Sequence, residues 1–349
     1  MDVEWGYNEV LIKEEDRWKA AFITNEGLFE PTVMFFGLTN SPATFQTMMN
    51  TIFRDLINGG SVTIYMDDIV IHTGCKEGET ENDHLIRHRD LVRQVLNRLC
   101  KNDLHLNLEK CTFEQDHLDF LGIRVARGIV EMEQAKVDKL KTWTRPHSVR
   151  EVQKFLGFTG YYRHFIKDYS KIARPLLDLT KQATLWHWED DQQRAFEELQ
   201  NKMVSKPVLR QPDFSRVFYL QTDASKYRVG AVLSQDEGPQ PTTPRKCHPV
   251  AYYSATFSPT EQNYDAHDLK FLGVIKAIDH WRPYLIWTQE PFMIETDHKN
   301  LTYWKSPRKL TGRTARWHEK LQDYNFRIVH VQGKNNTPAD ALSRPSEDE

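Results

Sequence analysis

The stretch SVTIYMDDIV, residues 61–70, decides the fold of this chain. Its apolar and β-branched residues are typical of a buried β-strand, but Asp67 and Asp68 interrupt the run. If VTIYM and IVIHT are antiparallel strands, the two aspartates occupy the two-residue turn of a hairpin. Adjacent carboxylates repel each other unless a cation binds them, and carboxylate oxygens suit Mg²⁺. On the hairpin evidence alone, a solvent-exposed acidic turn is the simpler explanation.

The chain has 349 residues, which predicts two or three compact units. Hydrophobic residues make up 39% of the sequence and charged residues 27%, as is typical of a soluble globular protein. No apolar run is long enough to cross a membrane, and no secretory signal opens the chain. The four cysteines lack metal-ligand spacing, which indicates reduced thiols. Because the net charge is −3, any contact with a polyanion must come from local basic surface.

The hydrophobic pattern divides the chain into three parts and a tail. Residues 1–126 alternate strand-like and helical runs in an α+β pattern. Residues 127–207 nearly lack strand-like runs and are expected to form a helical connector, with Ser148 as the N-cap of one helix. Residues 208–344 return to an α+β pattern with five strand-like runs and two long helical stretches, and residues 345–349 form a frayed tail.

The motifs around the Asp67–Asp68 pair occur in a recognisable order. YMDD is the Tyr-x-Asp-Asp signature of reverse transcriptases, MDVEWGYN and FFGLTNSPATFQ precede it, and HLNLEKCTF and LDFLGIRV follow it. Further along come EVQKFLGFTGYYRHFI, TDASKYRVGAVLSQ, ETDHKNLTYW and GKNNTPADALSR. Over essentially the whole chain, these motifs resemble the reverse transcriptase and ribonuclease H region of gypsy-type long-terminal-repeat retrotransposons (Metaviridae).

The resemblance implies an α+β multidomain fold. Its expected parts are a truncated palm and partial fingers over residues 1–126, a helical thumb and connection over 127–207, and a ribonuclease H-like α/β domain with a mixed sheet over 208–344. LDFLGIRV resembles the hairpin that grips the primer terminus in these polymerases, although its apolar residues equally suit a structural strand. The connector interleaves basic and aromatic residues, which fits either contact with a nucleic-acid duplex or a helix with an aromatic core and a basic face.

The resemblance also implies a polymerase site. Asp2 and Asp67 would hold two Mg²⁺ ions, or Mn²⁺ in their place, that activate the primer 3′-hydroxyl and stabilise the leaving pyrophosphate. Asp68 would support the same metal cluster. The implied nucleotide-binding residues are Tyr7, which crowds the sugar 2′ position, Gln46 and Met66.

Several residues near these motifs also have a structural explanation. For Tyr7, a role as a core aromatic residue is also plausible. The phenylalanines of the intervening motif, Phe35, Phe36 and Phe45, are better explained by packing. Lys110 corresponds to a lysine proposed to protonate the leaving pyrophosphate, but a lone lysine is more often a solvated surface charge.

The last α+β region resembles a ribonuclease H domain, which cleaves the RNA strand of a hybrid with four carboxylates around two Mg²⁺ ions. Asp223, Asp297 and Asp340 match three of these ligands, and His330 matches the mobile histidine that assists product release. Where the family has a glutamate, this chain has Lys270. Two unit charges 4 Å apart interact by about 4 kcal/mol at an effective dielectric of 20, so an ammonium there should oppose metal binding. We therefore expect a ribonuclease H unit that keeps its fold but is catalytically impaired.

The position of Asp2, the second residue, raises the question of what this chain represents. Since the preceding segment of the family builds most of the fingers, we expect either a processed polyprotein piece or a gene fragment, and poor primer extension by the isolated chain. Met1 inside a motif and Lys270 at a ligand position favour the fragment. Two functions stay open: an RNA-directed DNA polymerase with a linked ribonuclease H module, or a non-catalytic retroelement remnant that at most binds RNA–DNA hybrid.

The resemblance further implies the partners and the location of the protein. The partners would be an RNA template, a DNA primer, RNA–DNA hybrid and deoxynucleoside triphosphates, with no membrane. The location would be the cytoplasm, in retroelement particles, or the nucleus, and not the cell exterior. The sequence leaves the oligomeric state open.

Overall fold

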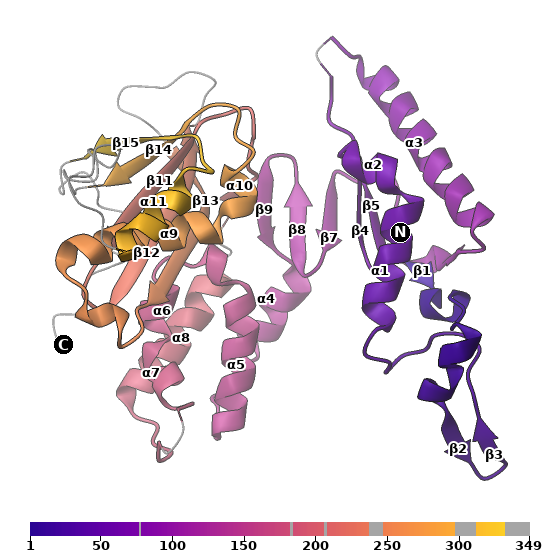
Figure 1. Ribbon diagram of the computed structural model, residues 1–349, viewed down its shortest axis with the longest axis horizontal. Helices are drawn as coiled ribbons and strands as arrows, with labels where there is room; N and C mark the ends of the chain where they lie inside the picture. Colours follow the sequence, from indigo (N-terminus) through magenta and orange to yellow (C-terminus); the bar gives the residue numbers. More distant parts are fainter. Residues whose placement is uncertain (77, 182–183, 206–207, 237–246, 297–311, 332–349) are drawn as a thin grey trace. The chain divides into compact units, whose positions relative to one another are not determined.

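The computed structural model describes residues 1–76, 78–181, 184–205, 208–236, 247–296 and 312–331. Contacts between Cα atoms divide the chain into two compact units, Met1–Gln115 and Asp116–Glu349, each of which is described by itself. Figure 1 labels their elements (Figure 1). Within the described ranges, no helix has the length and apolar character needed to cross a membrane.

The first unit combines short antiparallel strand pairs with helices. Its strands and α-helices are, in chain order, β1 (Val3–Glu4), β2 (Phe22–Thr24), β3 (Gly27–Phe29), α1 (Ser41–Ile52), α2 (Arg54–Asn58), β4 (Val62–Tyr65), β5 (Asp68–Ile71), α3 (Glu81–Lys101) and β6 (His105–Leu106). Strand β1 pairs with β6, β2 with β3, and β4 with β5. The hairpin predicted around YMDD is therefore present.

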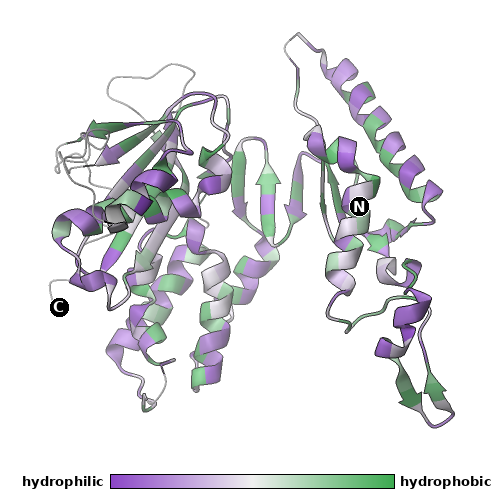
Figure 2. Cartoon of the chain, in the orientation of Figure 1, coloured by the Kyte–Doolittle hydropathy of each residue, from purple (hydrophilic) through white to green (hydrophobic). Residues whose placement is uncertain are grey.

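Helices α1 and α3 supply five of the eleven buried hydrophobic residues in the described core of this unit. Phe45 and Met49 are four residues apart on α1, and Leu91, Val95 and Leu99 recur every four residues on α3. This spacing places each set on one face of its helix, where the side chains pack with the β4–β5 hairpin. Figure 2 shows hydrophobic and hydrophilic residues alternating along α3, as expected for a helix with one buried face (Figure 2).

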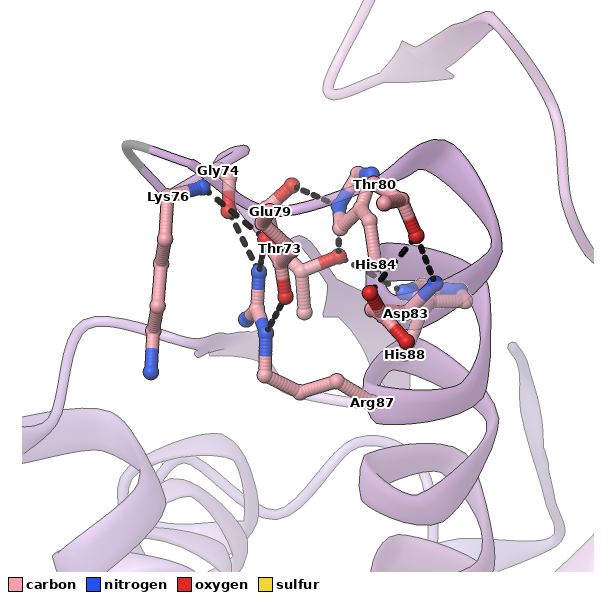
Figure 3. Close-up of polar contacts among 9 residues, drawn as sticks. All are labelled: Thr73, Gly74, Lys76, Glu79, Thr80, Asp83, His84, Arg87 and His88. Atoms are coloured by element: carbon pink, nitrogen blue, oxygen red, sulfur yellow. Dashed lines mark hydrogen bonds and ion pairs between the residues drawn. The ribbon is translucent and has the colours of Figure 1, made fainter.

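An ion pair fastens the loop between β5 and α3 to the first turns of α3 (Figure 3). Arg87 donates to both carboxylate oxygens of Glu79, at 2.7 and 2.8 Å, and to the Gly74 carbonyl at 2.6 Å. The hydrogen bonds from Arg87 lower the pKa of Glu79 to about 2. Thr80 caps α3, because its Oγ1 accepts from the Asp83 amide at 3.2 Å. The start of α3 is thus fixed relative to the loop.

Two histidines hold the other side of the same loop. The Thr73 hydroxyl lies 2.9 Å from His84 Nε2 and 3.1 Å from His88 Nδ1. His84 Nε2 also lies 2.9 Å from the Thr73 carbonyl oxygen. Burial lowers the pKa of His88, which favours its neutral form in the fold. Together with the ion pair, these contacts anchor the end of β5 to α3.

The second unit begins with a four-stranded antiparallel sheet of order β10-β9-β8-β7. Its strands are β7 (His117–Phe120), β8 (Ile123–Ala126), β9 (Ile129–Met132) and β10 (Leu209–Arg210). Strand β9, of four residues, lies inside the stretch that is expected to nearly lack strands, and it is not one of the strands predicted from the sequence. The reason is local: Gly128, at φ 71°, allows the chain to reverse and extend the preceding hairpin by one strand.

Five α-helices follow in the described part of the connector, as expected for a helical segment. They are α4 (Gln134–Lys141), α5 (Val149–Tyr161), α6 (Tyr169–Ile172), α7 (Arg174–Asp178) and α8 (Asp190–Val204). The Ser148 cap is confirmed, because its side chain accepts from the Glu151 amide at 3.3 Å. Phe155 is fully buried and its ring centroid lies 4.7 Å from that of Phe196. Several connector aromatics therefore form a core, whereas Tyr161 is 53% exposed.

A five-stranded mixed sheet forms the C-terminal part. Its strands are β11 (Phe218–Ala224), β12 (Arg228–Asp236), β13 (Cys247–Thr256), β14 (Phe292–Thr296) and β15 (Phe326–His330), and its helices are α9 (Ala266–His280), α10 (Arg282–Leu285) and α11 (Gly312–Leu321). The strand order is β13-β12-β11-β14-β15. Strands β11, β12 and β13 pair antiparallel, whereas β14 runs parallel to both β11 and β15. The predicted α/β domain with a mixed sheet is confirmed.

Candidate functional site

The YMDD turn joins β4 to β5. The register pairs Tyr65 with Asp68, so the two turn residues are Met66 and Asp67. The prediction that Asp67 and Asp68 form the turn is therefore wrong by one position, and Asp68 begins β5. The cause is the backbone of Met66, which takes up the left-handed region at φ 52° and completes the reversal one residue earlier.

The strand that carries Asp2 lies beside this turn. Asp2 and Asp68 form an isolated antiparallel β-bridge, and the Val3 amide donates to the Asp67 carbonyl at 2.9 Å. The Asn107 amide donates to the Asp2 carbonyl at 3.0 Å. These backbone contacts bring Asp2 and Asp67 to the lining of one pocket of about 250 Å³.

Negative charge is concentrated at this pocket. Burial raises the pKa of Asp68, and the neighbouring carboxylates of Asp67 and Asp2 raise it further. The Lys110 ammonium lies 3.3 Å from Asp2 Oδ1, and because the lysine side chain is 64% exposed, solvent weakens this ion pair. The sequence interpretation of Lys110 as a residue of this site gains a geometric basis from that ion pair.

The donor set fits a divalent cation with incomplete protein ligation. In the described part of the chain, no three His, Cys, Asp or Glu side chains are gathered as a metal site. Mg²⁺ is commonly held by one or two carboxylates, with substrate phosphates and water completing its octahedron. Asp2 and Asp67, which line the same pocket, could supply those carboxylates.

Gln46, on α1, holds the YMDD turn with both ends of its side-chain amide. Its Oε1 accepts from the Met66 amide at 2.7 Å, and its Nε2 donates to the Ile64 carbonyl at 3.2 Å. The Tyr7 hydroxyl lies 3.6 Å from Met66 Sδ. Tyr7 lines the pocket, whereas Gln46 and Met66 are not among its lining residues. Nucleotide binding by Gln46 and Met66 stays a prediction, and the structure assigns Gln46 a contact with the turn.

Phe36 is a pocket residue that the sequence interpretation missed. Its ring is 75% exposed, lines the pocket, and meets the Tyr7 ring edge-on at 4.9 Å. Phe45 lines the same pocket, but it is fully buried and its ring lies 5.4 Å from that of Tyr7, so the packing interpretation holds for it. The hydrophobic pattern around Phe35 and Phe36 does not show which phenylalanine lines a pocket and which packs in the core. That difference depends on tertiary contacts.

In the second unit, Asp223 and Lys270 come together. Asp223 lies near the end of β11 and is 8% exposed, and Lys270 Nζ reaches it from α9, 3.8 Å from its Oδ1. A cation therefore contacts the carboxylate that the resemblance implies as a metal ligand. The carboxylate of Glu261, which precedes α9, is paired with Lys276 at 2.8 Å.

Of the other predicted ribonuclease H residues Asp297, Asp340 and His330, the structure describes His330. Asp297 and Asp340 lie outside the described residues. His330 ends β15, where it pairs in parallel register with Thr296 of β14. An ammonium beside the one described ligand does not fit a divalent cation, because the two positive charges repel.

Two family models match the chain. The model described as reverse transcriptase (RNA-dependent DNA polymerase) matches residues 1–125, and that described as an RNase H-like domain found in reverse transcriptase matches residues 213–324. Among curated relatives, the Transposon Tf2-3 and Tf2-7 polyproteins of Schizosaccharomyces pombe are 39% and 38% identical over 348 residues. The alignment covers 99% of this chain and 25% of each relative, so the chain spans about a quarter of their length.

Solved structures share the fold. The foamy viral protease-reverse transcriptase in complex with RNA/DNA hybrid matches with a TM-score of 0.78 at 21% identity, over 99% of this chain and 44% of that one. The same viral protein in complex with dsDNA gives a TM-score of 0.75, over 95% of this chain and 67% of that one. These likenesses confirm the expected α+β architecture. The chain therefore carries a reverse transcriptase domain in residues 1–125 and a linked RNase H-like domain in residues 213–324, and it is homologous to the Tf2 transposon polyproteins.

Proposed function

We propose that this chain carries out RNA-directed DNA synthesis at the pocket beside the YMDD turn, at the low rate expected for the isolated chain, and that its RNase H-like domain is catalytically impaired. The observation that carries the first part is the convergence of Asp2, Asp67 and Lys110 on one pocket. The proposed partners are an RNA template, a DNA primer, their hybrid and deoxynucleoside triphosphates. The proposed location is the cytoplasm, in retroelement particles, or the nucleus.

The residues of the pocket have distinct proposed roles. Two Mg²⁺ ions, when bound, would activate the primer 3′-hydroxyl and neutralise the leaving pyrophosphate. Asp2 and Asp67 would hold them through carboxylate oxygens, and Asp68 would add negative charge beside them. Lys110, whose Nζ lies 3.3 Å from Asp2 Oδ1, would give a proton to the leaving pyrophosphate.

The wall of the pocket would select the nucleotide. Tyr7, braced edge-on by Phe36 and Phe45, would leave little room for a ribose 2′-hydroxyl. Gln46 would act indirectly, by keeping the Met66–Asp67 turn in the position that aims the Asp67 carboxylate. Each of these roles follows from a contact of the described residues, together with the resemblance.

Template-directed incorporation of deoxynucleotides tests the polymerase proposal. The chain is mixed with a primed RNA template, Mg²⁺ and nucleotides, and primer extension is followed. We expect Asp67→Asn to lose at least about 100-fold in rate, because the carboxylate that would ligate the metal becomes a neutral amide. Asp55→Asn is the matched control, since Asp55 pairs with Arg98 and does not line the pocket. Equal extension by Asp67→Asn and the unsubstituted chain would refute the proposal.

A second candidate is hybrid binding without cleavage by the RNase H-like domain. The contact between Lys270 and Asp223 favours it, because the ammonium opposes metal binding but would attract a phosphate. We expect a labelled RNA–DNA hybrid to bind and its RNA strand to stay intact in Mg²⁺. Hydrolysis at a rate normal for a ribonuclease H would contradict this.

A further inference from the structure

The hairpin formed by β7 and β8 reverses through two residues in the left-handed region. Leu121 has φ 50° and Gly122 has φ 78°, between the paired residues Phe120 and Ile123. Two-residue turns of this kind favour Asn-Gly or Asp-Gly, because Asn and Asp tolerate a positive φ. The leucine side chain has no polar group that could stabilise this backbone conformation. A strained residue persists only where its surroundings fix it, and such residues cluster at functional positions.

Two consecutive tyrosines at the end of α5 fix this turn. Tyr161 Oη donates to the Leu121 carbonyl at 2.5 Å, and Tyr162 Oη donates to the Gly122 carbonyl at 3.0 Å. The Glu133 amide donates to the same Gly122 carbonyl at 3.1 Å. The carbonyls of both turn residues are therefore held by groups about 10 to 40 positions away in the sequence.

The close approach constrains the turn as well. A Cβ at Gly122 would lie 2.7 Å from Tyr162 Oη, so glycine is needed there for space as well as for its φ. The two tyrosine rings meet edge-on at 4.9 Å, which fixes one hydroxyl relative to the other. We call Tyr161 and Tyr162 the tyrosine pair.

Core packing does not account for the two hydroxyl groups. The Tyr162 ring is 2% exposed and packs against Phe158 and Phe165, where a phenylalanine would fill the same space. Tyr161 is 53% exposed, so burial of its ring is not its main contribution. What the two residues share is a hydroxyl on the turn. Burial raises the pKa of Tyr162 to about 12, which keeps that hydroxyl a donor at any physiological pH.

We propose that Tyr161 and Tyr162 are positioning residues for DNA synthesis, whose hydroxyls hold the Leu121–Gly122 turn in the conformation that receives the primer end. The proposal rests on the proposed function and on the resemblance of this hairpin to one that grips the primer. Leu121 is 38% exposed, so the fixed turn presents an apolar side chain outward. Because the turn is already ordered before the primer binds, binding does not cost the conformational entropy of ordering the turn.

The test uses full-length Tyr161→Phe, Tyr162→Phe and the double variant. Tyr169→Phe is the matched control, because its hydroxyl lies 3.0 Å from Thr159 Oγ1 and makes no contact with the turn. Thermal unfolding, the Kd for a recessed primer–template, and kcat and KM for the next nucleotide are measured for each. We expect the double variant to lose about 10- to 100-fold in kcat/KM, with a thermal midpoint like that of the control.

Two further measurements separate positioning from general damage. Hydrogen exchange of the amides of residues 120–123 should accelerate in the double variant and not in Tyr169→Phe. Adding Leu121→Asn to Tyr161→Phe should recover part of the lost activity, since asparagine adopts the left-handed region more readily than leucine.

The outcomes are distinct. Extension like that of the unsubstituted chain overturns the proposal, whether or not exchange at the turn accelerates. A loss of extension matched by Tyr169→Phe also overturns it. If the unsubstituted chain extends no primer, the proposed function fails, while primer–template affinity and exchange still decide the role of the tyrosine pair. Weaker affinity with faster exchange in the double variant alone supports it.

Discussion

The ammonium of Lys270 lies 3.8 Å from Asp223 Oδ1, near the end of the central strand of the C-terminal sheet. The sheet and the helix that position these two groups are both formed, so a cation beside Asp223 is compatible with the framework of the domain. A single substitution of Lys270 can therefore test whether its charge blocks catalysis.

Lys270→Glu should give Mg²⁺-dependent cleavage of the RNA strand of a hybrid, because a second carboxylate would replace the cation beside Asp223. Cleavage is followed with a labelled RNA strand. Lys270→Met is the matched control: it removes the charge without supplying a ligand and should stay inactive. Equal cleavage by the two variants, or rapid cleavage by the unsubstituted chain, would contradict the prediction.

Gln46→Ala should slow DNA synthesis by about 10- to 100-fold, since the Met66 amide loses its acceptor and the YMDD turn loses its restraint. The free energy of unfolding should fall by only about 1 kcal/mol, the net value of a typical hydrogen bond. Steady-state extension and urea unfolding measure the two effects. Gln134→Ala removes an exposed amide contact with Asp138 and serves as the control. Similar extension rates for both variants would exclude a role for Gln46 in positioning the turn.

Gly6→Ala should destabilise the first unit by about 1–3 kcal/mol through overpacking. The new Cβ would lie 2.5 Å from Cζ of Phe45, whose ring is fully buried. Gly157→Ala provides the opposite case, because nothing lies near its Cβ position on α5 and alanine favours helix by about 0.5–1 kcal/mol. Denaturant unfolding measures both. Unchanged stability of Gly6→Ala would show that Phe45 can move aside.

The second unit should lose stability as the pH falls below 6.5. Burial lowers the pKa of His164. The nearby Arg163 and His280 lower it further, whereas a hydrogen bond to the backbone of Tyr161 raises it. In the unfolded chain the imidazole takes up its proton near pH 6.5, before the folded protein does. The contribution of neutral His164 to the free energy of unfolding is therefore complete above pH 6.5. It declines as the pH falls from 6.5 toward the lowered pKa of His164 in the folded protein. His164→Gln should flatten this pH dependence in thermal unfolding, and parallel curves for both proteins would contradict the assignment.

Regular hydrophobic periods made much of the fold predictable. The alternating or continuous apolar runs of β11 to β15 predicted all five strands of the C-terminal sheet, and apolar residues four apart predicted α3. The Ser148 cap was predictable because its hydrogen bond is local in sequence. Strand β9 was not predicted, because its four residues lie between a turn and a helix and are too few to show the alternating pattern of a strand.

Features that depend on tertiary contacts were less accessible. The turn register around Asp67 differs by one residue because Met66 adopts the left-handed region, where Gln46, 20 positions earlier, accepts from its amide. The exposure of Phe36 follows from where its loop meets Tyr7, which no local pattern encodes. By contrast, the contact between Lys270 and Asp223 could be predicted from the resemblance. The resemblance implies that position 270 of α9 faces Asp223 on β11.

The order of strands in the C-terminal sheet has a consequence for synthesis of the protein. Strand β11 is central, and its antiparallel neighbour β12 follows it almost at once, but its parallel neighbour β14 comes only with residues 292–296. While the ribosome is still making α9, a three-stranded meander can form with one side of β11 open. Open edges recruit strands from other chains, so any product ending before Phe292 should aggregate rather than remain as a smaller domain.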